Sequence, residues 1–183
     1  LDMLLEYCLS TGTPAVFATT GYNDEQISRI KAAGSQIPVF FTFNMSLGIN
    51  LLVQLAKKAA DILGDHFDIE IVEKHHNQKI DAPSGTAIML ANAINETLDN
   101  SRHYVYDRHS QRKKRDKNEI GMHAIRGGTI VGEHDVIFAG HDEVITLSHS
   151  ASSKSVFAEG SINAAVYLVG KEPGLYDMAN LVN

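Results

Sequence analysis

The sequence has no tryptophan and a single cysteine, Cys8, among its 183 residues. One cysteine excludes a framework of intrachain disulfide bonds and favours a reducing compartment, so we expect a cytoplasmic protein. No apolar run approaches the roughly 18 residues of a membrane-spanning helix. The first residues, LDMLLEYCLS, lack the basic segment of a signal peptide. We therefore expect no membrane partner.

Positive charge is also scarce, because 16 Lys and Arg residues stand against 22 Asp and Glu residues and give a net charge of −6. A mildly acidic chain is a poor candidate for general nucleic-acid binding. The basic run 108–117 is the exception, since it could bind nucleic acid or the phosphates of a cofactor. No aromatic residues interleave with it, so we interpret it as a solvated loop and expect no nucleic-acid partner.

The remaining composition is that of a folded protein, with 44% hydrophobic and 21% charged residues. The length allows one or two domains. Helix and strand patterns alternate over the first third of the chain, which predicts a parallel α/β sheet with right-handed crossovers. The expected elements are helices at 1–11, 23–33 and 46–63 and strands at 15–18 and 39–42.

The later part of the chain predicts an α+β arrangement. Residues 67–74, FDIEIVEK, alternate in polarity and predict a strand with one buried face, and a helix is expected at 86–98. Glycines then separate several short strands, which predict a mixed or mainly antiparallel sheet. We expect these strands at 123–126, 129–131, 136–139 and 144–149, a long loop at 101–119, a helix at 155–168 and a turn-rich tail at 171–178.

The stretch 73–87, EKHHNQKIDAPSGTA, carries the clearest chemistry. The amides of Gly85 and Thr86 lie at the expected start of a helix, where free N–H groups and the helix dipole hold anions. Gly85 lets a carboxylate approach the backbone closely, and Lys79 adds a full positive charge. The stretch therefore predicts a pocket for a small, multiply anionic substrate.

Two adjacent histidines, His75 and His76, lie in the same stretch. Imidazole titrates near neutral pH, so these side chains are suited to proton transfer beside the anion pocket. On the other hand, adjacent histidines often occur on protein surfaces without a function, and Ser-Gly-Thr is a common start of a helix. No third histidine or carboxylate stands at the spacing of a metal ligand, and Asp81 lies in the turn, so we predict no metal.

This stretch resembles the signature of the dihydrodipicolinate reductases, also called 4-hydroxy-tetrahydrodipicolinate reductases, of diaminopimelate and lysine biosynthesis. The pattern E-x-H-H-x-x-K-x-D-A-P-S-G-T-A is long and specific. The resemblance extends in order along essentially the whole chain. Further segments that resemble the family are ATTG at 18–21, FNMSLG at 43–48, IRGGTIVGEH at 125–134 and GKEPGLYDM at 170–178.

The resemblance implies the reduction of 4-hydroxy-tetrahydrodipicolinate to tetrahydrodipicolinate with loss of water, with NADH or NADPH as the cofactor. It implies that His75 is the acid–base group and Lys79 the second proton donor. The residues that it implies for binding the substrate's carboxylates are His76, Lys79, Gly85 and Thr86. The residues that it implies along the nicotinamide and its ribose are Ala18, Thr19, Thr20, Thr42, Phe43, Asn44 and Met45. Both nicotinamide segments follow expected parallel strands, at whose carboxyl ends ligands bind.

The resemblance also implies an α/β fold in two domains. Residues 1–45 and 155–183 would form a partial Rossmann-type parallel sheet, and residues 46–154 an α+β substrate-binding domain whose mixed sheet builds a homotetramer. The family opens with a Gly-rich turn for the pyrophosphate, and no such turn occurs here. We therefore expect that a segment before Leu1 is missing, and that the chain alone binds the cofactor weakly and is inactive.

Some positions depart from the family pattern. Ala18 replaces a glycine, which still allows a backbone contact, and Lys154 replaces an arginine, which keeps the charge but loses the planar fork. Arg126 could bind substrate or pair with Glu133, and we interpret Arg126 and His134 as structural. Two other functions stay open: a non-catalytic dicarboxylate-binding or oligomer-scaffold fragment, and another two-domain Rossmann reductase, although such reductases lack the signature loop.

Overall fold

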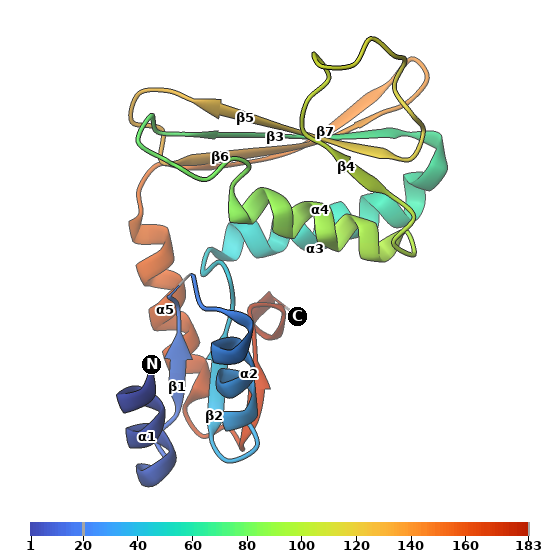
Figure 1. The fold of residues 1–183 in the computed structure, drawn as a ribbon. Coiled ribbons are helices and arrows are strands. Elements are labelled where there is room, and N and C mark those ends of the chain that lie inside the picture. The colour runs from blue at the N-terminus through green and yellow to red at the C-terminus, as the bar shows by residue number, and fades with distance from the viewer. Residues whose placement is uncertain (20, 183) are drawn as a thin grey trace. The chain divides into compact units, whose positions relative to one another are not determined.

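The computed structural model describes residues 1–19 and 21–182 (Figure 1). The chain forms two compact units, Leu1–Asn50 with Ser155–Asn183, and Leu51–Lys154. Each unit has a sheet of its own. In the described part of the chain, no helix is long and apolar enough to cross a membrane.

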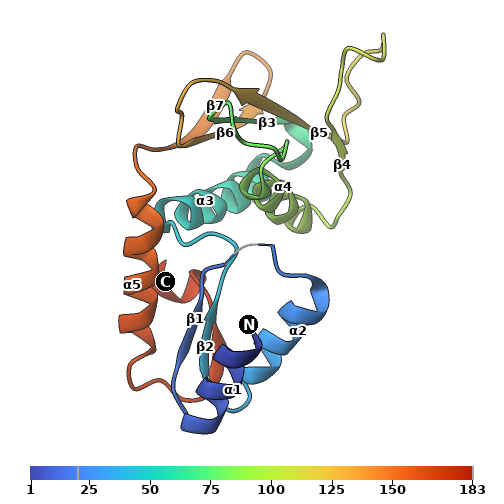
Figure 2. The same cartoon turned by 60° about the vertical axis from the view of Figure 1, so that its left-hand side comes forward.

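The first unit is an α/β unit with a three-stranded parallel sheet. Its elements are α1 (Asp2–Thr11), β1 (Ala15–Phe17), α2 (Asp24–Ala33), β2 (Pro38–Phe41), α5 (Ser155–Leu168), β8 (Gly174–Tyr176) and α6 (Ala179–Val182). The strand order is β1-β2-β8, and helices cover both faces of the sheet (Figure 2). Side chains of α1 and α2 pack with Val39 and Phe41, and side chains of α5 pack with Phe40 on the other face. All four residues of β2 are buried for this reason.

Local sequence sets the helix ends in this unit. Asn23 caps α2 by accepting a hydrogen bond from the Gln26 amide, and the Gln26 side chain accepts one from the Asn23 amide. Gly12 ends α1 in the left-handed region with a φ of 70°. The boundaries expected from Asn23 and Gly12 are therefore confirmed.

Helix α5 lies very close to the loop that follows β2. A Cβ atom added at Gly160 would lie 1.7 Å from the carbonyl oxygen of Met45. The Met45 side chain is buried in the same core cluster as Ala164 and Leu168 of α5. Glycine at position 160 thus lets the helix backbone approach the loop, and this packing fixes the main chain after β2.

The second unit has a five-stranded sheet in the middle of the sequence. Its elements are most of α3 (Leu47–Leu63), the 3-10 helix η1 (Gly64–His66), β3 (Asp68–His75), α4 (Gly85–Thr97), β4 (His103–Val105), β5 (Glu119–Arg126), β6 (Gly132–Ala139) and β7 (Val144–Ala151). The strand order is β4-β5-β3-β6-β7, in which β3 runs parallel to β5 and antiparallel to β6. Helices α3 and α4 lie along one face (Figure 1). The expected mixed sheet is confirmed.

Strand β3 alternates in burial as its sequence predicts. Ile69, Ile71 and Glu73 are buried, and the residues between them are less so. Their neighbours Val136 and Phe138 on β6 are also fully buried. The carboxylate of Glu73 therefore lies in a row of core side chains, where it needs polar partners.

Three expectations from the sequence are wrong in detail. Residues 129–131 form part of a turn rather than a strand, because Gly128 adopts a φ of 48° and the chain reverses between β5 and β6. The expected loop at 101–119 contains β4, and the expected turn-rich tail contains β8. These strands have three residues each. They depend on long-range pairing with β5 and β2, which leaves no local periodicity.

Candidate active site

Two segments that are distant in the sequence meet at the end of β3. His75, the last residue of β3, is the register partner of Arg126 at the end of β5. Glu73 is the register partner of His134 near the start of β6. The two family-like segments that contain these residues therefore form one cluster.

Glu73 is the buried centre of this cluster, with 1% of its side chain exposed. Its carboxylate accepts hydrogen bonds from both terminal nitrogens of Arg126, at 2.8 and 2.7 Å, and from the Ser84 amide at 3.0 Å. Nδ1 of His75 lies 2.6 Å from the same carboxylate. Burial raises the pKa of Glu73, but these hydrogen bonds outweigh burial and hold the pKa below its usual range. The carboxylate is therefore ionised at neutral pH.

The ring of His75 is held on three sides. Its Nδ1 faces Glu73. The ring of His134 stands edge-on to it, with centroids 5.2 Å apart and planes at 75°. Gly132 lies beside Nε2, where an added Cβ would be 3.1 Å away. With Nδ1 bonded to a carboxylate, Nε2 is the nitrogen that remains for proton transfer.

His134 also belongs to this cluster, although its sequence context led us to expect a purely structural role for it. Its side chain is buried, and its Nε2 lies 3.1 Å from Oγ of Ser84. Burial, together with the charge of a protonated His75, lowers the pKa of His134 to about 4. His134 is therefore neutral at physiological pH. The alternating burial of β6 shows in its sequence that position 134 faces inward, but only the strand register reveals its neighbours.

The start of α4 has the features of the predicted anion site. The Ser84 side chain caps the helix by accepting a hydrogen bond from the Ala87 amide at 3.2 Å. Gly85 is exposed, and a Cβ atom added there would meet no atom within 4 Å. The main chain at Gly85 therefore borders open space at a helix N-terminus, which attracts anions.

The loop between β3 and α4 carries His76 and Lys79. The Lys79 amide donates a hydrogen bond to the His76 carbonyl oxygen at 3.1 Å, which closes a turn. The Lys79 ammonium lies 2.7 Å from Asp81, and this contact holds the pKa of Asp81 below its usual range. Both predicted side chains are half-buried. The structure thus brings the predicted substrate-binding residues onto one loop and the helix start that follows it.

Arg126 has a different partner from the expected one. It pairs with Glu73 rather than with Glu133, and its Nη2 also donates to the carbonyl oxygen of Asp81 at 2.6 Å. Glu133 instead binds the ammonium of Lys74 at 2.9 Å. The reason is the strand register, because neighbouring residues of a strand face opposite sides of the sheet and Lys74 follows Glu73.

The residues predicted to contact a nicotinamide lie in the first unit, at the carboxyl ends of neighbouring parallel strands. Ala18 and Thr19 follow β1, and residues 42–45 follow β2. Thr20 lies outside the described residues. The parallel pairing of β1 with β2 puts both segments at one edge of the sheet. Ligands of open α/β sheets bind at this kind of edge.

The segment after β2 is ordered by its own polar groups. The Thr42 hydroxyl donates a hydrogen bond to the Asn44 carbonyl oxygen at 3.2 Å, and the Asn50 side chain donates another to the same oxygen at 2.9 Å. The Phe43 side chain is 60% exposed, whereas the Met45 side chain is buried in the core. Phe43 therefore presents an aromatic surface at this edge, and Met45 is left with only its main chain for a ligand contact.

This edge fits the nicotinamide end of a pyridine nucleotide better than the phosphates. The exposed Phe43 ring offers apolar surface to a planar ring. Helix α2, by contrast, begins with Asp24 and Glu25, whose negative charges oppose a phosphate at that helix start. Among residues 1–19 and 21–182, no three or more His, Cys, Asp or Glu side chains are grouped so that they could hold a metal ion.

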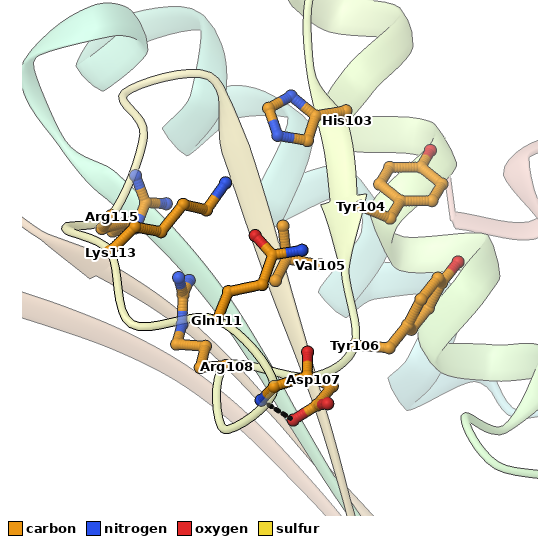
Figure 3. Close-up of a pocket in the computed structure, with 10 residues that line it drawn as sticks. His103, Tyr104, Val105, Tyr106, Asp107, Arg108, Gln111, Lys113 and Arg115 are labelled. Carbon is orange, nitrogen blue, oxygen red and sulfur yellow. Dashed lines mark hydrogen bonds between the residues drawn. The ribbon is translucent and has the colours of Figure 1, made fainter.

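A separate pocket of about 510 Å³ lies over the basic run of the second unit (Figure 3). Figure 3 shows the cationic side chains of the loop on one wall and Tyr106 on the other. Arg108 lies 2.6 Å from both Glu70 and Glu119, and Arg115 lies 3.0 Å from Glu70. The segment is a loop, as expected, but carboxylates of the sheet bind Arg108 and Arg115 and hold the loop against the sheet.

Comparisons with known proteins agree on one family. The family model "Dihydrodipicolinate reductase, N-terminus" matches residues 1–45, and "Dihydrodipicolinate reductase, C-terminus" matches residues 48–182. The 4-hydroxy-tetrahydrodipicolinate reductase of Caldanaerobacter subterraneus is 59% identical over 92% of this chain and 67% of that protein. The Clostridium novyi enzyme of the same name is 50% identical over 100% of this chain and 72% of that protein. A structure titled as dipicolinate-bound dihydrodipicolinate reductase from Paenisporosarcina sp. TG-14 superposes with a TM-score of 0.70 at 27% identity, covering 96% of this chain and 68% of that chain.

Proposed function

Because the chain belongs to the dihydrodipicolinate reductase family, we propose that it carries out the reduction of 4-hydroxy-tetrahydrodipicolinate to tetrahydrodipicolinate with NADH or NADPH. The observation that carries this proposal is the cluster at the end of β3. There a carboxylate-bound imidazole, His75, stands next to a lysine-bearing loop and an open helix start. We assign substrate binding to the second unit and nucleotide binding to the first.

The substrate in this proposal is a small dicarboxylate. Its carboxylates are held by positive charge from the loop and by N–H groups at the start of α4. The groups assigned to this role are His76, Lys79, Gly85 and Thr86. The open space beside Gly85 supports the assignment, since a carboxylate can reach the main chain there. The ligand named for the Paenisporosarcina structure, dipicolinate, is also a dicarboxylate.

Proton transfer is assigned to His75 and Lys79. The overall reaction consumes one hydride and one proton and releases water, so negative charge that develops on the substrate must be stabilised and protonated. His75 is positioned to donate from Nε2, because Glu73 holds its Nδ1. The ammonium of Lys79 stabilises the same charge and serves as the second donor.

We assign the nicotinamide end of the cofactor to the edge formed after β1 and β2. The cofactor supplies a hydride when it is bound. The exposed ring of Phe43 would contact it, and Thr42 and Asn44 hold the loop that carries this ring. The full set assigned to this role is Ala18, Thr19, Thr20, Thr42, Phe43, Asn44 and Met45.

We further propose a homotetramer that forms through the five-stranded sheet. The face of this sheet opposite α3 and α4 carries Lys74 and Ile125, and Ile125 is 47% exposed. At the edge strand β7, Val144 and Ile145 are exposed as well. Exposed apolar groups on a sheet face and edge favour pairing with another copy. We place the enzyme in the cytoplasm, in keeping with a free, buried Cys8.

A reductase assay tests the proposed function. The protein, produced as its complete natural chain, is mixed with freshly prepared 4-hydroxy-tetrahydrodipicolinate and either NADH or NADPH. We expect oxidation of the nucleotide that depends on the substrate and that pyridine-2,6-dicarboxylate inhibits. Absence of substrate-dependent oxidation with both nucleotides would contradict the proposal.

A further inference from the structure

Glu73 links two parts of the proposed site that belong to different elements. Its Oε2 lies 2.6 Å from Nδ1 of His75, on the same strand. Its Oε1 accepts the amide of Ser84 at 3.0 Å, and Ser84 is the residue that caps α4. One buried carboxylate therefore contacts both the proposed proton donor and the residue before the proposed anion site.

Arg126 offsets the energetic cost of burying the Glu73 carboxylate. A buried carboxylate without partners is strongly unfavourable, and a bidentate guanidinium offsets that cost. Arg126 binds both carboxylate oxygens of Glu73 and also reaches the carbonyl oxygen of Asp81. The same arginine thus fixes Glu73 and the loop that carries Lys79.

The contact with Glu73 decides how His75 presents its ring. An ionised carboxylate only accepts hydrogen bonds, so Nδ1 of His75 must carry a proton. Nε2 then points away from Glu73 and is left for the substrate.

We propose that Glu73 is the positioning residue of this site. It holds His75 with Nε2 toward the substrate and at the same time holds the start of α4, so that the proton donor and the anion site keep a fixed spacing. The inference rests on the proposed function and adds to it a residue that touches neither substrate nor cofactor. Arg126 supports Glu73 in this role.

Charged and titratable groups from several elements belong to the cluster that contains His75. These groups are Glu73 on β3 itself, Arg126 on β5, His134 on β6, and Lys79 and Asp81 in the loop before α4. His134 is neutral at physiological pH, and Lys79 and Asp81 neutralise each other. Glu73 is the charged group in direct contact with the ring.

The variant Glu73→Gln tests the proposal, because glutamine keeps the size and one acceptor oxygen but removes the charge. We expect kcat to fall about tenfold or more. We also expect nitrogen NMR of isotope-labelled histidine to show that the neutral His75 loses its fixed proton on Nδ1, because the glutamine amide can donate to that nitrogen. The affinity for pyridine-2,6-dicarboxylate should fall as well, because a single acceptor oxygen cannot serve Ser84, Arg126 and His75 together.

A matched control lies on the opposite face of the same strand. Glu70 binds His123 at 2.7 Å and Arg115 at 3.0 Å, which is a network of the same composition. Glu70→Gln should leave kcat unchanged and the proton of the neutral His75 on Nδ1. Both variants disrupt a network of Glu, His and Arg on β3, but only Glu73→Gln disrupts the network that holds His75. An effect seen in Glu73→Gln alone is therefore specific to His75.

Two results would overturn the positioning role. One is a Glu73→Gln enzyme in which the neutral His75 keeps its proton on Nδ1, whatever its stability, because a merely structural glutamate would leave the tautomer unchanged. If Glu73→Gln does not fold, nitrogen NMR of isotope-labelled histidine in the wild-type protein decides. We expect the neutral His75 to carry its proton on Nδ1, and a proton on Nε2 overturns the proposal. Failure of the proposed function is distinct, since it appears as absent turnover in the wild-type enzyme.

Discussion

Gly132, the first residue of β6, lies directly against the ring of His75 at the end of β3. A Cβ atom added at Gly132 would be 3.1 Å from Nε2 of His75, which is closer than ordinary van der Waals contact. The glycine therefore leaves room for the nitrogen that we assign to proton transfer. It also explains why a glycine stands next to Glu133 and His134 in this segment.

We expect Gly132→Ala to lower kcat by about tenfold or more, because the added methyl group pushes Nε2 out of line with the substrate. The fold should remain, since only the ring has to shift. Steady-state kinetics and thermal unfolding of the same preparation check this. Gly127→Ala is the control, because a Cβ there meets nothing within 4 Å and should leave kcat unchanged. Wild-type kcat in Gly132→Ala would contradict the assignment of Nε2.

Gly85→Ala should weaken binding of pyridine-2,6-dicarboxylate by about tenfold or more, which corresponds to about 1.4 kcal/mol. The added methyl group meets no protein atom within 4 Å, so it occupies space that we assign to the ligand. Alanine is also a better helix former than glycine, so stability should not fall. Calorimetric titration beside a melting curve measures both effects. Unchanged affinity would remove the start of α4 from the binding site.

Gly160→Ala should destabilise the first unit by about 1–3 kcal/mol, because its Cβ would overlap the Met45 carbonyl oxygen at 1.7 Å and force α5 away from the loop. Denaturant unfolding measures this change. Ser161→Ala, on the same helix, is the control and should change stability by no more than about 0.5 kcal/mol. Equal stability of the two variants would show that α5 does not pack as described.

His134 should make stability depend on pH in a defined window. Burial, with a protonated His75 and with His149 and Lys79 nearby, lowers its pKa from 6.5 to about 4, although Glu73 opposes the shift. Between these values the unfolded state binds a proton that the folded state does not. The free energy of unfolding therefore rises with pH across the window and falls as the pH drops, by about 3 kcal/mol at most.

The variant His134→Gln tests this dependence, because glutamine does not titrate. Denaturant unfolding at several pH values between about 4 and 6.5 should give a flatter pH dependence than in the wild-type protein. His141→Gln replaces a histidine whose side chain is 96% exposed, and it should keep the wild-type slope. An unchanged slope in His134→Gln would contradict the buried, neutral state of His134.

Local pattern accounts for the parts of the fold that the sequence predicts. The ends of α1 and α2 follow from Gly12 and the Asn23 cap, and β3 follows from its alternation. The candidate site at 73–87 is predictable for the same reason, because its side chains lie on one strand end, one loop and one helix start. Candidate functional residues that lie within one short segment can be recognised from the sequence.

Long-range register accounts for the parts that the sequence does not predict. Arg126 and Glu73 are 53 residues apart, and their pairing depends on β5 lying parallel to β3. The contact of His134 with Ser84 spans 50 residues and depends on β6 in the same way. Short strands such as β4 are also stabilised by their neighbours rather than by their own sequence. No periodic pattern in the local sequence indicates any of these contacts.

The most direct test of the account is the turnover of His75→Ala and Lys79→Ala in the complete natural chain, measured with 4-hydroxy-tetrahydrodipicolinate and NADH or NADPH. We expect each variant to keep its fold and to lose kcat/KM by about a hundredfold or more, as expected for removal of a proton donor. We also expect Lys79→Ala to bind pyridine-2,6-dicarboxylate more weakly. Unchanged turnover in both variants would contradict the account.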